Sequence, residues 1–150
     1  MSMKKMMTAL VLGAAAALTS IGAMAQDKYP LVLGDYWEVT GVKLKDGGGL
    51  KYAEFIASEW KQDGEFAKSK GWIKDYKIFS NVYARAGEPD IYLVTISESL
   101  VSGAENEKRG DEYQAWKKKT IAQMESESGN RAEFREIVDG ALLQELTIRK

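Results

Sequence analysis

The segment from Tyr36 to Lys70 decides the fold, with the sequence YWEVTGVKLKDGGGLKYAEFIASEWKQDGEFAKSK. Its first seven residues are rich in aromatic and β-branched side chains, which predicts a strand over 36–42. A glycine turn over 46–49 follows, and then a long amphipathic helix, because apolar residues recur at the spacing of one helix face. Those apolar residues are Tyr52, Phe55, Ile56, Trp60 and Phe66. Gly71 is expected to end the helix, since glycine takes the left-handed conformation of a helix stop without steric cost.

The rest of the chain repeats this unit in a looser form. We expect a second strand from Ile73 to Tyr83, a turn over 86–90, and a third strand from Ile91 to Ile96. The third strand is nearly all apolar, which favours a central place in a sheet. A polar loop is then expected over 97–110, followed by a helix that Asp111 caps. The buried side of this helix would carry Tyr113, Trp116, Thr120, Ile121 and Met124, and a break follows over 126–129. A short helix opened by Asn130 and Glu133 and stopped by Gly140 precedes a last strand over 141–148.

The order strand, helix, strand, strand, helix, strand predicts an α+β protein of the ferredoxin-like βαββαβ type. Such a protein has an antiparallel four-stranded sheet with its helices on one face, and we expect the first and third strands in the middle. Gln26–Gly34 contains Pro30 and forms an extended lead-in. Its residues Leu31–Leu33 are compatible either with an edge strand or with packing across the core.

Large apolar side chains stand at both odd and even positions of the predicted strands. Trp37 and Val39 alternate with Tyr36 and Val42, and the other strands follow the same pattern. Helices cover only one face of such a sheet, and an uncovered apolar face usually marks an interface. We therefore expect a homodimer packed sheet against sheet.

Residues 1–25 have the features of a secretory signal peptide. Lys4 and Lys5 precede an apolar run over 6–18, and Ala23-Met24-Ala25 is a small-x-small cleavage pattern. The alternative, a membrane anchor, needs about 20 apolar residues to cross the hydrocarbon core. The run is shorter, so we expect cleavage after Ala25, a periplasmic or secreted location and a single domain over 26–150. No insertion into a membrane is expected after cleavage.

The segment order and the two-faced strands resemble those of the dimeric α/β-barrel superfamily, in which two ferredoxin-like protomers close a barrel between their sheets. The resemblance extends over most of 36–148. The strings Asp35-Tyr36-Trp37-Glu38-Val39 and Gly87-Glu88-Pro89-Asp90-Ile91-Tyr92 also resemble uncharacterised exported bacterial proteins. The superfamily includes haem enzymes, cofactor-free oxygenases and isomerases, and proteins without known catalysis, and a fold by itself does not choose among them.

Residue types that are missing from the chain exclude several chemistries. The sequence contains no histidine and no cysteine, so histidine-ligated haem, zinc clusters, thiol nucleophiles and the usual serine triad cannot be built. We expect no cofactor and no metal site. The chain carries 21 basic and 22 acidic side chains, and without a concentrated basic patch a nucleic-acid partner is not expected.

Polar residues on the predicted strands are the candidates for ligand binding. They are Glu38, Thr40, Phe79, Asn81, Tyr83, Thr95 and Glu145, a set that mixes polar and aromatic groups and that could share one sheet face with Lys77. Such a mixture suits a small-molecule pocket. A half-hydrated dimer interface explains the same residues and is the interpretation we favour, because one slip in strand register exchanges the two faces.

Three functions are compatible with these features. The first is an exported dimer that binds a small apolar ligand or a protein partner without catalysis. The second is a cofactor-independent oxygenase or isomerase acting on an aromatic or polyketide-like compound, with Glu38 as a base if it is buried. The resemblance to the cofactor-free oxygenases of the superfamily implies an asparagine and a tryptophan beside the substrate, and Asn81 with either Trp37 or Trp60 could correspond to them. The third is an envelope structural protein that acts through its surface.

Overall fold

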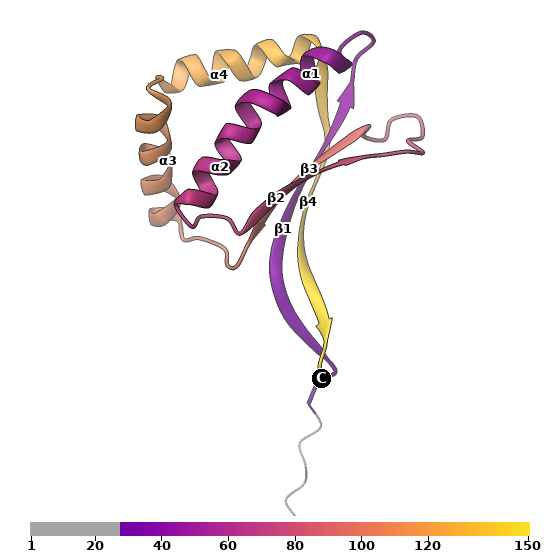
Figure 1. Ribbon diagram of the computed structural model, residues 1–150, viewed down its shortest axis with the longest axis vertical. Coiled ribbons are helices and arrows are strands. Elements are labelled where there is room, and N and C mark those ends of the chain that lie inside the picture. The colour runs from indigo at the N-terminus through magenta and orange to yellow at the C-terminus, as the bar shows by residue number, and fades with distance from the viewer. Residues whose placement is uncertain (1–27) are drawn as a thin grey trace, which may run out of the picture.

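The computed structural model describes residues 28–150, so the predicted signal peptide and Gln26 lie outside the described residues. The chain forms an α+β domain with one four-stranded antiparallel sheet (Figure 1). Its elements are β1 (Leu31–Leu44), α1 (Gly49–Phe55), η1 (Ile56–Trp60), α2 (Lys61–Ser69), β2 (Asp75–Ser80), β3 (Ile91–Ser97), α3 (Gly103–Lys117), α4 (Ile121–Asn130), η2 (Arg131–Glu133) and β4 (Arg135–Ile148). This content is compatible with a ferredoxin-like fold.

The strands lie in the order β2-β3-β1-β4, so the first and third strands are central as predicted. Strand β1 pairs with β3 from Tyr36 to Val42 and with β4 from Leu31 to Leu44. The lead-in Leu31–Leu33 therefore extends β1 and pairs with Leu146–Ile148. Beyond the reach of β2 and β3, β1 and β4 continue as a two-stranded ribbon that projects away from the helices (Figure 1).

The predicted long helix is present from Gly49 to Ser69, with one irregular turn. In η1 the N–H of Lys61 donates to the carbonyl of Ile56, five residues back, which makes this turn a π-helix. Gly71 follows the helix with φ at 68°, as expected for a glycine that ends one. The turn before the helix has Gly47 at a φ of 74°. An added Cβ on Gly48 would lie 2.2 Å from the Phe134 carbonyl, which explains why glycine stands there.

The second half of the chain differs from the sequence prediction. The polar segment 97–110 is not all loop, because α3 begins at Gly103 and is capped by Ser102 instead of Asp111. The predicted single helix is two helices, which separate at Lys118 in the left-handed conformation, with a φ of 54°. Thr120 and Gln123 form a capping box that starts α4, and this helix runs through the predicted break at 126–129.

The predicted short helix after Asn130 is also wrong. Asn130 makes no side-chain cap, and the helical turn ends at Glu133. From Arg135 the chain is already in β4, and Gly140 lies within this strand opposite Thr40. Ile137 and Val138 carry β-branched side chains, which favour a strand. Ile137 pairs with Val42 of β1, and Val138 is the residue skipped at a register shift in this pairing. Strand β4 therefore has 14 residues and begins six residues before the last predicted strand, at Arg135 instead of Ala141. It lies at one edge of the sheet.

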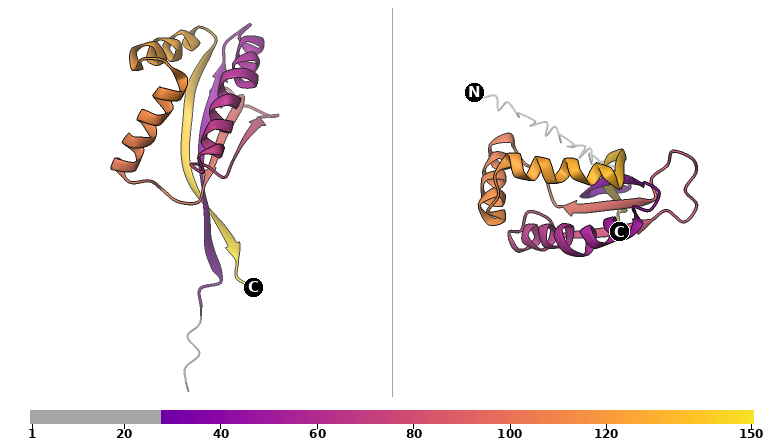
Figure 2. Two further views of the ribbon diagram at one scale, coloured as in Figure 1. Left: turned by 60° about the vertical axis from the view of Figure 1, so that its left-hand side comes forward. Right: turned by 90° about the horizontal axis from the view of Figure 1, so that it is seen from above.

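The helices lie to one side of the sheet (Figure 1). The view from above in Figure 2 shows α4 and the α1–α2 helix running alongside each other. We call the helix-facing surface the inner face. Cross-strand pairing places Glu38, Thr40 and Val42 of β1 on this face beside Thr95, Leu93 and Ile91 of β3. The main core forms there, where Val42, Tyr52, Ile56 and Leu93 are buried together.

The opposite surface, here called the outer face, is apolar and carries no helix. Trp37 and Val39 of β1 share it with Val94 and Ile96 of β3 and with Leu143 of β4. Val94 and Ile96 are already buried within the protomer, whereas Leu143 is 54 % exposed. The predicted apolar character of this surface is thus correct, although neighbouring side chains already shield its centre.

Candidate functional site

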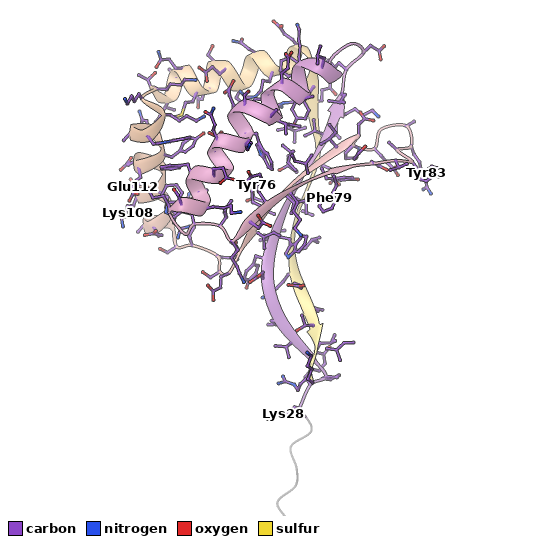
Figure 3. All side chains as sticks on the ribbon, viewed as in Figure 1. Lys28, Tyr76, Phe79, Tyr83, Lys108 and Glu112 are labelled. Atoms are coloured by element: carbon purple, nitrogen blue, oxygen red, sulfur yellow. The ribbon has the colours of Figure 1, made fainter. Side chains whose placement is uncertain are left out.

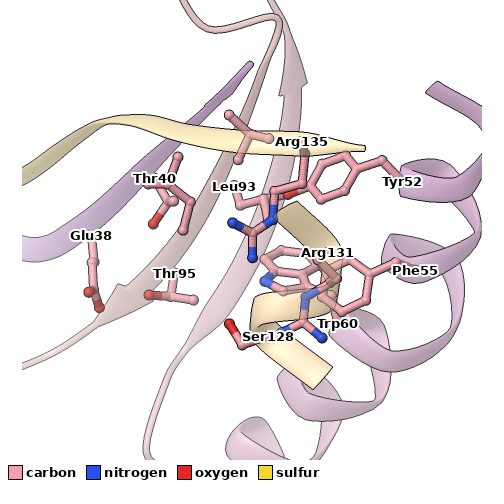
Figure 4. A pocket seen from close by; sticks show the side chains of 12 residues that line it. Glu38, Thr40, Tyr52, Phe55, Trp60, Leu93, Thr95, Ser128, Arg131 and Arg135 are labelled. Atoms are coloured by element: carbon pink, nitrogen blue, oxygen red, sulfur yellow. The ribbon is translucent and has the colours of Figure 1, made fainter. Parts of the chain in front are cut away.

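A hollow of about 330 Å³ lies between the inner face and the helices (Figure 4). We call it the sheet–helix hollow. Its lining comes from every layer of the protein: β1, β3 and β4 form the floor, α1 and η1 one wall, and the end of α4 with η2 another. The lining residues are Glu38, Thr40, Val42, Tyr52, Phe55, Trp60, Leu93, Thr95, Ser128, Arg131, Arg135 and Ile137.

Aromatic side chains form one wall of the hollow. Tyr52 stacks on Phe55 with 5.7 Å between ring centroids, and Trp60 stands at the end of the π-helical turn. An extra residue in a helical turn rotates the side chains that follow it, and such turns often occur at functional sites. Trp60 is also held from behind, because its ring meets that of Tyr76 edge-on at 5.2 Å. The wall is therefore apolar and rigidly supported.

Polar groups form a strip on the floor. Glu38 lies opposite Thr95 in the β1–β3 pairing, and Thr40 lies opposite Leu93. Although Glu38 lies on the inner face, its side chain is exposed. Figure 4 shows it on the side of the hollow away from the aromatic wall. The burial that the base hypothesis required of Glu38 is therefore not observed. Glu38 and Thr95 also border a second hollow of about 430 Å³ beneath α3.

Two arginines reach into the hollow from the segment that joins α4 to β4 (Figure 4). Arg131 lies over the ring of Phe55, with 4.4 Å between its guanidinium carbon and the ring centroid. Burial lowers the pKa of Arg135, and the positive charge of Arg131 lowers it further. Burial also raises the pKa of the Tyr52 hydroxyl, against the smaller opposing effect of both arginines. The hydroxyl thus stays protonated near neutral pH.

The predicted ligand-binding residues separate into two groups. Glu38, Thr40 and Thr95 line the hollow together, as the sequence suggested. Phe79 pairs with Tyr92 and Lys77 with Val94, so these side chains lie on the outer face, and the prediction that they share a face with Glu38 is wrong. The reason is strand register. A difference of one residue between the predicted and the observed pairing of β2 with β3 moves every side chain of β2 to the opposite face of the sheet.

The other predicted residues lie at the periphery. Asn81 is in the β2–β3 connection, where its amide nitrogen donates to the Pro89 carbonyl at 3.0 Å. Tyr83 stands near the tip of that connection with 89 % exposure (Figure 3). Glu145 lies in the ribbon beside Gly34. Of the tryptophans considered for oxygenase chemistry, Trp60 lines the hollow, whereas Trp37 lies on the outer face beneath Lys77.

The sequence patterns indicate neither arginine as a site residue, and of the aromatic wall they point only to Trp60. The local pattern predicts a short helix that includes Arg131 and Arg135, of which only the turn Arg131–Glu133 forms. The pattern therefore does not indicate that Arg135 belongs to a strand beside β1. The helical spacing predicts Tyr52, Phe55 and Trp60 on the buried side of the helix, which is correct for Tyr52. The same spacing gives no sign that Phe55 lines a cavity. The site becomes visible only when the tertiary structure brings these residues and Glu38 around one hollow, because a local sequence pattern contains no such information.

The described residues hold no group of three or more histidine, cysteine or acidic side chains arranged to bind a metal. Between residues 28 and 150 no helix has the length and apolar character to cross a membrane. Comparisons with protein-family models, with curated proteins and with solved structures give no match to this chain.

Proposed function

We propose that this protein is an exported ferredoxin-like protein of the dimeric α/β-barrel type that acts as a homodimer and binds a small apolar or aromatic molecule in the sheet–helix hollow. The hollow itself carries the proposal. Its volume of about 330 Å³ falls within the range of roughly 300–1,000 Å³ that is typical of small-molecule sites. Its lining combines aromatic area, which favours binding, with a few polar groups, which orient a ligand.

The chemistry of the lining favours binding over catalysis. Glu38 is exposed, and Thr40 and Thr95 are hydroxyl groups without a histidine or lysine beside them in the lining. A hydroxyl nucleophile needs an adjacent base to be activated. The same groups serve well as hydrogen-bond partners for a bound molecule. A ligand with a single six-membered aromatic ring, or with two fused ones, would fit against the aromatic wall formed by Phe55 and Trp60.

Calorimetric titration with two aromatic probes tests ligand binding. We expect 2-naphthol or 2-naphthoate to bind the protein, and we expect Thr95→Phe, which fills the hollow from its floor, to abolish binding. Ser80→Phe is the matched control, because Ser80 is an exposed strand residue outside the lining. Circular dichroism verifies that both variants fold. Failure of both probes to bind, or unchanged binding by a folded Thr95→Phe protein, would refute the proposed function.

The proposed homodimer rests on the outer face and on β4. Leu143 and Phe79 leave 54 % and 46 % of their side chains exposed on the outer face, and Leu142, Leu146 and Ile148 are exposed along β4. A long apolar edge strand with free backbone groups invites pairing with another strand. A second copy of the chain is the partner that presents the same surface, as a two-fold interface requires.

Sedimentation velocity tests the dimer. The wild-type protein is expected to sediment as two copies, and Leu143→Asp to sediment as one, because a buried unpaired charge is costly at an interface. Leu50→Asp is the control: Leu50 is 72 % exposed at the start of α1 and away from the outer face. A monomeric wild-type protein, or a Leu143→Asp variant that stays dimeric, would contradict this part of the proposal.

A further inference from the structure

The two arginines of the hollow lack the partners that arginines normally have. Among residues 28–150, the ion pairs within 4.0 Å include Arg109 with Glu105 at 2.8 Å, but none involves Arg131 or Arg135. The Nε atom of Arg131 is buried and has no hydrogen-bond partner in the described part of the chain. A buried donor without a partner costs free energy, so its presence asks for an explanation.

The position of these charges adds to their cost. Both guanidinium groups line the same hollow, and the charge of one lowers the pKa of the other. Like charges in a partly buried site repel more strongly than in water. Glu38, the acidic group of the lining, stands on β1 and forms no ion pair with either arginine. Among the described residues no carboxylate comes within 4.0 Å of either guanidinium group. Arg131 acts only at longer range on Glu127, whose carboxyl pKa is lowered chiefly by its hydrogen bond from Lys119.

Resting on the proposed function, we infer that the ligand of the hollow is an aromatic or apolar anion, such as an aryl carboxylate, whose acidic group binds Arg131 and Arg135. The planar fork of arginine matches a carboxylate with two parallel hydrogen bonds. The protonated Tyr52 hydroxyl and the Ser128 hydroxyl line the same end and supply further donors (Figure 4). The apolar body of the ligand would lie against Phe55 and Trp60.

The arrangement gives each part of the ligand one set of partners. Arg131 is already held in a plane by the ring of Phe55, so little conformational freedom is lost when the anion binds. The threonines and Glu38 lie across the hollow from the arginines (Figure 4). They are suited to a polar substituent at the far end of the ligand, and the negative charge of Glu38 would disfavour a second acidic group there.

A matched pair of probes tests this inference separately from the proposed function. 2-Naphthoate and 2-naphthol share the ring system and differ in the anionic group. We expect the wild-type protein to bind 2-naphthoate at least about tenfold more tightly, because hydrogen bonds to charged groups are the stronger ones. Arg135→Gln should weaken 2-naphthoate about 10- to 100-fold and leave 2-naphthol within about twofold, and Arg131→Gln/Arg135→Gln should abolish the preference.

Arg85→Gln is the control, since it removes the same charge from the exposed β2–β3 connection, outside the hollow. It should leave both affinities unchanged. Equal binding of the two probes by the wild-type protein, or an equal loss for both probes in Arg135→Gln, would overturn the anion inference while the ligand-binding proposal stands. If neither 2-naphthoate nor 2-naphthol binds the wild-type protein, the ligand-binding proposal itself is refuted.

Discussion

Gly64 offers a sharp test of how the helix layer supports the hollow. It lies inside α2, where glycine is normally unfavourable by about 1 kcal/mol relative to alanine. A Cβ added there would lie 2.7 Å from Cδ1 of the Tyr76 ring, a separation that well-packed atoms do not tolerate. The ring has little freedom to move away, because its hydroxyl donates to Glu65 at 2.6 Å and its edge meets Trp60.

The sign of the Gly64→Ala effect follows from these two contributions. Overpacking a filled site costs about 1–3 kcal/mol, and the helix propensity of alanine returns about 1 kcal/mol. We therefore expect a net loss of about 1 kcal/mol in the free energy of unfolding, or a fall of roughly 3–5 °C in Tm for a domain of this size. Since Tyr76 also supports Trp60, the affinity of the hollow for 2-naphthoate should fall as well.

Urea unfolding measures the change, and Gly110→Ala is the matched control. Gly110 lies inside α3, and nothing stands within 4 Å of its added Cβ. This variant should be stabilised by about 0.5–1 kcal/mol. In a Tyr76→Ala background, Gly64→Ala should become stabilising too, because the clash is gone. If Gly64→Ala stabilised the wild-type protein as much as Gly110→Ala does, the packing argument would be refuted.

Two further predictions concern contacts outside the hollow. Asp90 binds the Lys43 ammonium and the Leu44 N–H, both at 2.8 Å, and these bonds hold the pKa of its carboxyl below the ordinary value. Asp90→Asn should cost about 1 kcal/mol at neutral pH. The difference in unfolding free energy between the wild-type protein and Asp90→Asn should be fully present above the unfolded-state pKa of about 4. It should vanish as the pH falls through the lower pKa that Asp90 has in the folded state, and urea unfolding at several pH values measures it. Thr120→Ala should cost about 1 kcal/mol in thermal unfolding, because Thr120 accepts from the Gln123 N–H at 3.2 Å, and Thr120→Ser, which keeps the acceptor, should restore most of it.

Local sequence patterns were sufficient for the first half of the chain. The strand at Tyr36–Val42, the helix that ends before Gly71 and the strand at Ile91–Ile96 all lie where periodicity and glycine chemistry predict them. Each of these signals is local, since a helix face or a strand face is determined by neighbours a few residues apart. The central position of the first and third strands also follows the prediction.

Tertiary structure decided the second half and the candidate site. The segment after Asn130 carries a helical pattern, yet it pairs with β1 over most of its length, because long-range strand pairing outweighs a weak local preference. That pairing also brings Arg135 beside Tyr52 and across the hollow from Glu38, residues that are far away in the sequence. The sequence by itself determined which residues are apolar, which chemistries are missing and where the first helix ends. Which residues share the hollow depends on strand register and on the path of the helices over the sheet, and these result from contacts between distant segments.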